Sequence, residues 1–385
     1  MKEEWCLNCF CIKGDYEVCP YCGYRDGEGP QKECQLSPGT VLKKRFIVGR
    51  VLGQGGFGII YLAFDTVLGA RVALKECFPA GIVNRAAHSL RVQPLGGEKK
   101  EAWKRAKKNF LQSARYLAGL TDVYQAMHVN CYFEANGTAY LMMEYIEGKS
   151  LAQLLEEREK VGEAEALSVI CAVLEGLWRI EKKGLIHGDL SPGNVMVTGR
   201  GRIKLIDFGA ACKIDDVMGQ QTVRDGYSPP ELYGEPKQAK SQIDVYSAGA
   251  ILFEMLTNMH PPKALDRFEK SGDLDAYMEK AGVSGWLGGI IKKSMELSWQ
   301  KRYEDAGQML EAIQRERKAH NQGEKRGGES SHSRGKKNIW EKFWTFLMAA
   351  VCIALSGSIL LAVLKGEMRA KAEVEISVPE EVDHE

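Results

Sequence analysis

Residues 186–194 read Ile-His-Gly-Asp-Leu-Ser-Pro-Gly-Asn, and Asp-Phe-Gly follows at residues 207–209. Asp189 and Asn194 lie five positions apart on one predicted loop. That spacing suits a carboxylate that accepts a hydroxyl proton beside an amide that holds a metal ion. Asp207 directly follows a strand pattern, Ile-Lys-Leu-Ile, and could hold Mg²⁺ at the end of that strand. The order of these three groups predicts a site for phosphoryl chemistry.

A glycine-rich stretch lies upstream, where residues 53–58 read Gly-Gln-Gly-Gly-Phe-Gly. This pattern alone fits a dinucleotide fold, a P-loop or a hairpin that covers phosphates. A P-loop would end in Gly-Lys-Ser/Thr, and a dinucleotide fold would continue as a helix, whereas residues 59–63, Ile-Ile-Tyr-Leu-Ala, favour a strand. The hairpin is therefore favoured. Lys75 ends the strand pattern Val-Ala-Leu-Lys, where its ammonium could meet the α- and β-phosphates.

These motifs together resemble those of the eukaryotic-type (Hanks-type) serine/threonine protein kinases, in a bacterial, membrane-anchored form. The resemblance covers about residues 45–317 and implies an α+β, two-lobed fold with residues 37–319 as the kinase domain. It also implies transfer of the γ-phosphoryl of ATP to Ser or Thr of protein substrates, including autophosphorylation. Further landmarks are Asp244, at the start of a helix that anchors the catalytic loop, and Arg302, which would pair with Glu231.

The resemblance assigns roles to individual residues of this chain. It implies ATP and Mg²⁺ as cofactors, a gatekeeper at Met143 and a hinge whose backbone meets adenine. The implied catalytic residues are Asp189, Lys75, Asn194 and Asp207, of which Asn194 and Asp207 would hold Mg²⁺. The implied nucleotide-binding residues are Gly53, Gly55, Gly58, Lys75, Met143, Glu144 and Ile146.

Three positions depart from the family pattern. Ser113 falls where a helix Glu would orient Lys75 through a charge-assisted bond. Gly188 replaces the Arg of His-Arg-Asp, which normally receives a phosphate on the activation segment, so we expect activity without that phosphorylation. Ser191 stands where the family usually carries Lys near the transferred phosphate. These changes leave open a second hypothesis, a catalytically weak or inactive pseudokinase scaffold that binds nucleotide or partner proteins.

The N-terminal segment, residues 1–36, is rich in cysteine. Two CxxC pairs suit a tetrahedral structural zinc site with four thiolate ligands. So short a segment cannot bury enough apolar surface to fold unaided, and a metal would supply the folding energy. The alternative is a redox CxxC or a set of unrelated cysteines. The predicted zinc ligands of this ribbon are Cys6, Cys9, Cys19 and Cys22.

The C-terminal part contains the one membrane signal of the sequence. Residues 343–364 carry no charge over 22 positions, enough for a helix to cross a bilayer, although a buried core helix is the alternative. A Gly/Ser/Lys-rich stretch before this run, residues 320–342, is predicted to be a flexible, basic juxtamembrane linker. Its Lys and Arg residues place the kinase domain in the cytoplasm by the positive-inside rule, and residues 365–385 form a short outer tail.

The overall composition is that of a globular protein. Lys+Arg is 52 and Asp+Glu is 51, so the net charge of +1 gives no global argument for nucleic-acid binding, and we expect none. The expected partners are ATP, protein substrates and, through one helix, the membrane. Neither the oligomeric state nor the substrate can be predicted from the sequence.

Overall fold

The computed structural model describes residues 5–86, 89–158, 161–214, 223–234, 240–269 and 274–327. Residues Met1–Ala319 form one compact unit and His320–Glu385 a second. The predicted membrane helix, residues 343–364, and the predicted outer tail lie outside the described ranges. Within those ranges, every helix is too short or too polar to cross a membrane.

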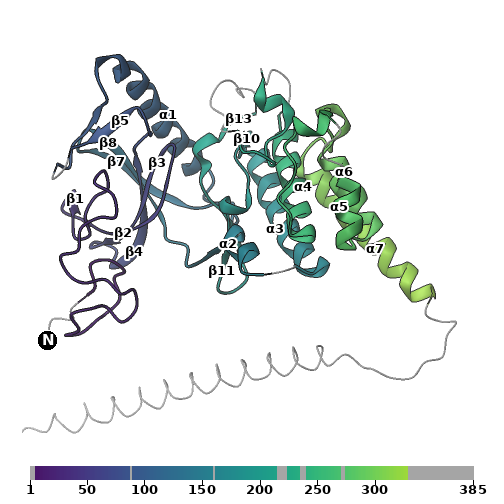
Figure 1. Ribbon diagram of the computed structural model, residues 1–385, viewed down its shortest axis with the longest axis horizontal. Coiled ribbons are helices and arrows are strands. Elements are labelled where there is room, and N and C mark those ends of the chain that lie inside the picture. The colour runs from purple at the N-terminus through teal and green to yellow at the C-terminus, as the bar shows by residue number, and fades with distance from the viewer. Residues whose placement is uncertain are drawn as a thin grey trace, which may run out of the picture. The chain divides into compact units, whose positions relative to one another are not determined.

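The first of two lobes is built on a six-stranded antiparallel sheet (Figure 1). Helix α1, Lys100–Ala118, packs against β4, β7 and β8 of this sheet. An Asn-Gly pair forms the turn between β7 and β8, and both residues have positive φ (54° and 76°) as a tight hairpin requires. The strands, in sheet order, are β1 (Val41–Leu42), β2 (Phe46–Gly55), β3 (Gly58–Asp65), β4 (Ala70–Cys77), β8 (Thr138–Glu144) and β7 (Val129–Ala135).

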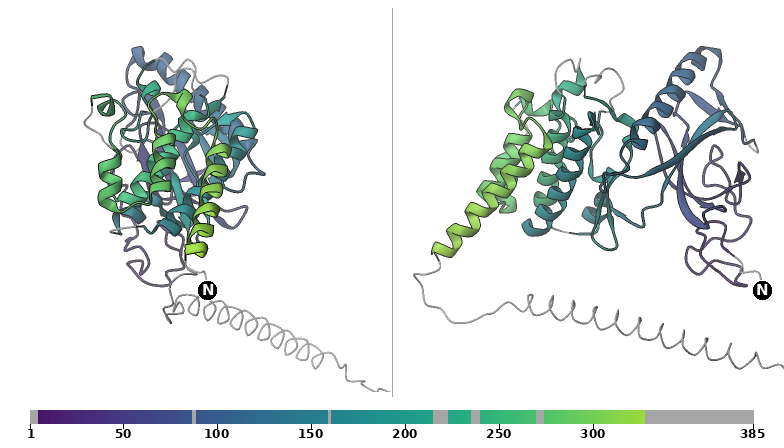
Figure 2. Two further views of the ribbon diagram at one scale, coloured as in Figure 1. Left: turned by 90° about the vertical axis from the view of Figure 1, so that its right-hand side faces the viewer. Right: turned by 180° about the vertical axis from the view of Figure 1, so that it is seen from behind.

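The second lobe is mostly helical, as Figure 2 shows from two further sides. Its central helix, α4, is buried along almost its whole length, which explains why its sequence is apolar nearly all round. The helices of this lobe are α2 (Leu151–Glu156), α3 (Glu163–Lys182), α4 (Gln242–Thr257), α5 (Leu274–Ala281), α6 (Gly285–Ser294) and α7 (Ala306–Gly327). Because α7 continues to Gly327, the first part of the predicted flexible linker is helical.

Short strands and turns complete the fold. Strands β11 and β12 form a hairpin that presents the residues before and after it to the space between the lobes. The short strands are β5 (Val83–Arg85), β6 (Val92–Pro94), β9 (Gly148–Ser150), β10 (Leu185–Ile186), β11 (Val195–Thr198), β12 (Ile203–Leu205) and β13 (Cys212–Lys213). The 3₁₀ turns are η1 (Gly97–Lys99), η2 (Pro192–Asn194), η3 (Phe208–Ala210), η4 (Pro230–Tyr233), η5 (Asp266–Glu269) and η6 (Trp299–Lys301).

The cysteine-rich segment packs against β2 and β3. The Arg50 amide donates to the Asn8 carbonyl (2.9 Å). The rings of Trp5 and Phe64 meet edge to face, with centroids 4.4 Å apart. Gly49 leaves room for the Phe10 ring, because a Cβ at residue 49 would lie 2.7 Å from it. The segment is therefore joined to the sheet by both packing and a backbone hydrogen bond.

A buried polar network supports β4 from the face opposite the cleft. The Glu76 carboxylate is fully buried and forms an ion pair with Arg85, whose side chain is 2% exposed. The same carboxylate accepts hydrogen bonds from Tyr140 Oη (2.6 Å) and Tyr61 Oη (3.1 Å). The Leu36 amide in turn donates to Tyr61 Oη (3.1 Å). The strand that ends in Lys75 and Glu76 is thus fixed from behind to the chain that follows the cysteine segment.

Candidate active site

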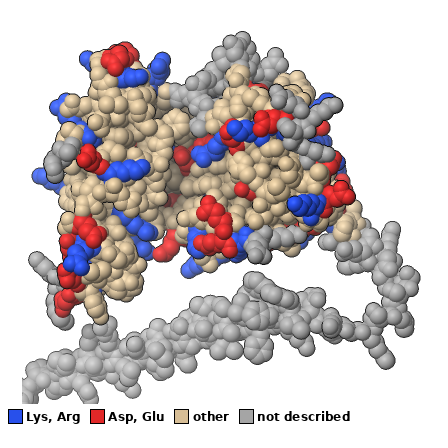
Figure 3. All heavy atoms as spheres, in the orientation of Figure 1, with Lys and Arg blue, Asp and Glu red and all other residues tan. Residues whose placement is uncertain are grey.

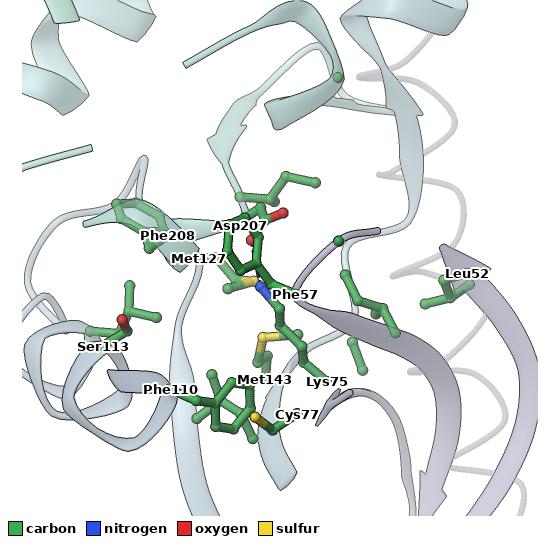
Figure 4. A pocket seen from close by; sticks show the side chains of 18 of the residues that line it. Leu52, Phe57, Lys75, Cys77, Phe110, Ser113, Met127, Met143, Asp207 and Phe208 are labelled. Carbon is green, nitrogen blue, oxygen red and sulfur yellow. Dashed lines mark hydrogen bonds and ion pairs between the residues drawn. The ribbon is translucent and has the colours of Figure 1, made fainter. Parts of the chain in front are cut away.

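A cavity of about 940 Å³ lies between the two lobes. Its inner end is apolar, and its mouth is bordered by the β2–β3 hairpin. Figure 4 shows the side chains that converge on it from the sheet, from α1 and from the second lobe. The apolar lining includes Ile60, Ala73, Leu141, Met143, Met127 and Phe208. A flat aromatic ligand with a polar tail suits such a cavity.

The glycines of the β2–β3 hairpin serve two purposes. A Cβ at Gly58 would lie only 2.2 Å from the Glu76 carbonyl oxygen, so β3 approaches β4 closely only because residue 58 is Gly. Nothing lies within 4 Å of the positions that a Cβ would take at Gly53 and Gly55. Leu52, Gly56 and Phe57 of this hairpin line the cavity, whereas the predicted nucleotide-binding glycines Gly53, Gly55 and Gly58 lie outside its lining.

Lys75 and Asp207 face each other across the cavity, from β4 and from the residue that precedes η3. Lys75 Nζ lies 2.5 Å from Asp207 Oδ1, and Figure 4 shows the lysine directed toward this carboxylate. The neighbouring Lys75 cation lowers the pKa of Asp207. Asp207 has φ 59°, a left-handed conformation that is strained for a residue with a side chain. Strain of this kind clusters at functional sites, where the surrounding structure maintains it.

Helix α4 holds the catalytic loop in place through Asp244. Its buried carboxylate accepts hydrogen bonds from the His187 amide (2.7 Å) and the Gly188 amide (2.9 Å). Burial raises the pKa of Asp244. Gly188 has φ 74°, and a Cβ there would lie 3.0 Å from the Ala210 carbonyl, so glycine suits the conformation that this loop adopts. The anchoring role predicted for Asp244 is confirmed.

Asp189 and Asn194 meet on this loop as their spacing predicts. Asn194 Nδ2 donates to the Asp189 carbonyl (2.7 Å) and lies 3.4 Å from Asp189 Oδ2. Because the amide nitrogen makes these contacts, Asn194 Oδ1 remains the metal-binding atom of this side chain. Both side chains are buried or nearly so. The Asn194 carbonyl accepts from the amide of Ile206, the residue before Asp207 (2.9 Å), so this loop adjoins the residue that pairs with Lys75 in the cavity.

The hinge residues Met143, Glu144 and Ile146 line the same cavity, as predicted. The Glu144 carboxylate also has a structural role that the sequence did not suggest. Its Oε1 accepts hydrogen bonds from Lys204 Nζ (2.7 Å) and the His128 amide (2.8 Å). Lys204 lies on β12 and is almost completely buried, so this pair ties the end of β8 to the second lobe.

Helix α1 offers no acid to Lys75 in this arrangement. Ser113 lines the cavity, and its hydroxyl donates to the Asn109 carbonyl of its own helix (3.1 Å). In Figure 4, Ser113 lies away from the ammonium of Lys75. The register predicted for this helix places the missing Glu at Ser113, and the lysine pairs with Asp207 instead.

Arg224, in the segment before η4, was not identified from the sequence. Its Nε lies 2.8 Å from Asp189 Oδ1 and its Nη2 lies 3.0 Å from Asp189 Oδ2, a bidentate ion pair. The nearby pair between Arg302 and Glu231 forms as predicted, with distances of 2.6 and 2.9 Å. The only sequence signal for the Arg224 contact is indirect, since Ser191 leaves the catalytic loop without a cation.

The four predicted zinc ligands lie together in the cysteine-rich segment. Their sulfur atoms all lie within 4.8 Å of one another, with 3.6 Å between Cys6 and Cys22 and 3.7 Å between Cys9 and Cys19. Thiolates about 2.3 Å from a tetrahedral metal would lie roughly 3.8 Å apart, so the cluster fits zinc. Each CxxC turn ends in a residue with positive φ, Phe10 (57°) or Gly23 (70°). The sequence indicates Gly23 for this turn but not Phe10.

On the face shown in Figure 3, positive and negative side chains are interspersed over both lobes. The surface of this face therefore repeats the even charge balance of the sequence.

Comparisons with known proteins point to one family. The family model described as the protein kinase domain matches residues 46–312. A probable serine/threonine-protein kinase PknB of Bifidobacterium longum is 29% identical over 229 residues, which are 58% of this chain and 32% of that protein. The serine/threonine-protein kinase B of Synechocystis sp. is 27% identical over 320 residues, which are 79% of this chain and 51% of that protein. This chain thus spans about a third of the length of the first relative and about half of the second.

A solved structure described as the apo form of PpkA-294 has a TM-score of 0.64 and 26% sequence identity. The match covers 73% of this chain and 99% of that one.

Proposed function

Because this chain belongs to the protein kinase domain family, we propose that it transfers the γ-phosphoryl group of ATP to Ser or Thr side chains of protein substrates, itself included. The observation that carries the proposal is the chain of contacts around one cleft between the lobes. Lys75 and Asp207 pair in the cavity, the Ile206 amide beside Asp207 donates to the Asn194 carbonyl (2.9 Å), and the Asn194 side chain donates to the Asp189 carbonyl (2.7 Å). Phosphoryl transfer needs little covalent chemistry from a protein and depends mainly on positioning and charge stabilisation.

Each of these side chains has one task in this proposal. Asp189 accepts the proton of the substrate hydroxyl, and Lys75 holds the α- and β-phosphates. Gly53, Gly55 and Gly58 allow the hairpin backbone to cover the phosphates. The adenine lies against the apolar lining, with the backbone of Glu144 and Ile146 at its edge and Met143 at its inner end.

Magnesium would be held by Asn194 and Asp207. Both offer oxygen atoms, the ligands that this ion prefers. The lowered pKa of Asp207 keeps its carboxylate ionised, as a metal ligand must be. When bound, the ion would supply positive charge that offsets the charge of the phosphates.

The first test measures transfer of labelled phosphate from ATP by the full chain, purified in detergent with Mg²⁺. We expect label on an added protein substrate or on the chain itself, and we expect it to disappear in Asp189→Asn. Asp225→Asn provides a matched control, because Asp225 forms an exposed pair with Lys263 outside the cleft. Equal label in the wild type and Asp189→Asn would contradict the proposal.

The second candidate function is a scaffold that binds nucleotide without transferring phosphate. The observation that favours it is the absence of an acid at Ser113, which leaves the orientation of Lys75 to Asp207. A scaffold would show thermal stabilisation by ATP and Mg²⁺ with no label transferred. Transfer that depends on Asp189 would exclude it.

The cysteine-rich segment is proposed to hold one structural zinc ion through Cys6, Cys9, Cys19 and Cys22. The tetrahedral spacing of the sulfur atoms supports this proposal. Four thiolates leave no open coordination position, so the ion would stabilise the fold. We expect one zinc per chain by elemental analysis and loss of zinc in Cys9→Ser. Cys34→Ser should retain the metal, and an equal zinc content in both variants would contradict the site.

The membrane part of the proposal rests on the sequence. Residues 343–364 would anchor the protein, with the kinase domain on the cytoplasmic side and residues 365–385 outside. The full chain should stay with membranes after an alkaline carbonate wash, whereas a chain that ends at residue 338 should be released. Release of the full chain would contradict the anchor.

A further inference from the structure

The contact between Arg224 and Asp189 joins two segments 35 residues apart in sequence. Both carboxylate oxygens of Asp189 receive a guanidinium nitrogen, at 2.8 and 3.0 Å. Such a fork fixes the plane of a carboxylate as well as its position. The Asp189 side chain is 7% exposed and that of Arg224 is 42% exposed, so the carboxylate is desolvated while the guanidinium keeps contact with solvent.

Ser191 explains why Asp189 needs a cation from another segment. It lies two residues after Asp189 on the same loop, and its hydroxyl is buried with no hydrogen-bond partner among the described residues. A neutral, unpartnered side chain at this position supplies no charge to balance Asp189. The balancing cation therefore comes from the segment that carries Arg224.

The backbone of Arg224 is held firmly enough for this role. Its amide donates to Ser228 Oγ (2.8 Å), and its carbonyl accepts from the amides of Tyr227 (3.1 Å) and Ser228 (2.9 Å). The Tyr227 carbonyl in turn accepts from Ser247 Oγ on α4 (2.9 Å). Helix α4 also holds the catalytic loop through Asp244, so one buried helix fixes both partners of the ion pair.

The contacts of Asp189 leave part of its carboxylate free to accept a hydrogen bond from a substrate. An ionised carboxylate has about four lone-pair sites, of which the guanidinium takes two and the long contact to Asn194 a third. One site remains for a substrate hydroxyl. Arg224 is half-exposed, and its Nη1 makes none of these bonds, so part of the guanidinium stays accessible to solvent.

We propose that Arg224 is a positioning residue that orients the Asp189 carboxylate and provides the cation that Ser191 cannot. This inference rests on the proposed kinase function. It predicts that the pair is needed for turnover more than for nucleotide binding or folding.

The test compares variants of the full chain in the assay of labelled ATP. Arg224→Met should lower kcat roughly 10- to 100-fold, as expected for loss of the partner that orients a reactive group. The KM for ATP and the melting temperature should change little. Arg224→Lys keeps the charge but loses the bidentate geometry, so its kcat should lie between those of the wild type and Arg224→Met. Lys263→Met, which removes the cation of the exposed Asp225 pair in the same region, should behave as the wild type.

A second substitution provides the rescue. Ser191→Lys placed in the Arg224→Met background should have a kcat at least tenfold higher than that of Arg224→Met. Ser191→Lys alone should not raise kcat above that of the wild type. A kcat for Arg224→Met equal to that of the wild type would overturn the inference. A higher kcat would overturn it too and identify the pair as an inhibitory clamp. A wild type that transfers no phosphate would overturn the proposed function, and this inference with it.

Discussion

The two walls of the cleft hold their charged groups in different ways. On the wall formed by the second lobe, Asp189 is held by Arg224 and Asn194, and its loop is fixed by Asp244. On the opposite wall, the ion pair that Lys75 makes among the described residues is with Asp207, across the cleft. The first wall is therefore preorganised by its own contacts, whereas the lysine takes its orientation from the other lobe.

The backbone behind the lysine is nevertheless rigid. Glu76, the next residue, points to the other face of the sheet, where Arg85, Tyr140 and Tyr61 surround its carboxylate. The first lobe thus fixes the backbone of Lys75 but not the position of its ammonium group. Four substitutions test this difference between the walls.

The largest effect is expected for Asp207→Asn. The change removes a proposed metal ligand and the partner of Lys75 together, so both walls lose a contact. Phosphate transfer should fall on the order of 10³-fold, the scale of a lost electrostatic stabiliser at a reacting group. Asp122→Asn, which breaks an exposed pair with Lys183, serves as the control in the same labelled-ATP assay. Activity of Asp207→Asn within tenfold of the wild type would show that the lysine is held by another group.

Glu76→Gln should cost the most folding stability. It leaves Arg85, with a side chain 2% exposed, as a buried and unpaired cation, which typically costs about 3–5 kcal/mol. The matched control is Glu175→Gln, which breaks an exposed pair with Arg179 and should cost less than about 1 kcal/mol. Urea unfolding measures both free energies. Equal losses in the two variants would mean that the network behind β4 does not support the sheet.

Ser113→Glu should make the two walls more alike, because each would then hold its charged group with a partner from its own lobe. A carboxylate on the cavity side of α1 would give Lys75 a partner within its own lobe. We expect a gain in kcat/KM of up to roughly tenfold, equivalent to about 1.4 kcal/mol. Ser113→Gln controls for side-chain size, since it has nearly the same shape without the charge. A gain in both variants, or in neither, would argue against a role for charge at this position.

The smallest effect concerns Glu181 of α3, beneath the catalytic loop. Burial raises its pKa to about 8. An acid whose pKa is raised on folding binds its proton more tightly in the folded state, so stability falls as the pH rises from near 4.5 to near 8. Glu181→Gln should remove this fall, so its free energy of unfolding should decrease less than that of the wild type between pH 5 and pH 8. Urea unfolding of both proteins at the two pH values measures this difference. An equal change in the free energy of unfolding of the two proteins would contradict the prediction.

The sequence predicts the parts of the site that are set by short stretches of chain. Lys75 lies near the end of β4, Asp207 follows β12, and Asp189 and Asn194 share a loop, so local geometry brings each to its place. The two-lobed α+β fold follows from the same motifs through the family resemblance.

Other contacts depend on how distant segments meet. Arg224 reaches Asp189, and Lys204 reaches Glu144, only after the second lobe has closed on its own core. No spacing rule connects either pair. Phe10 adopts a left-handed conformation that the sequence favours only for glycine or asparagine, because its ring packs over Gly49 and beside Phe64.

That last contact has a consequence for how residue 49 can be substituted. A methyl group at residue 49 would collide both with the Phe10 ring and with the Asn8 carbonyl, at 2.7 and 2.8 Å. The glycine is therefore needed only while the cysteine module lies against the sheet. Residue 49 and the cysteine-rich segment therefore form one unit of substitution, in which a larger residue at position 49 is compatible only with a displaced or deleted segment.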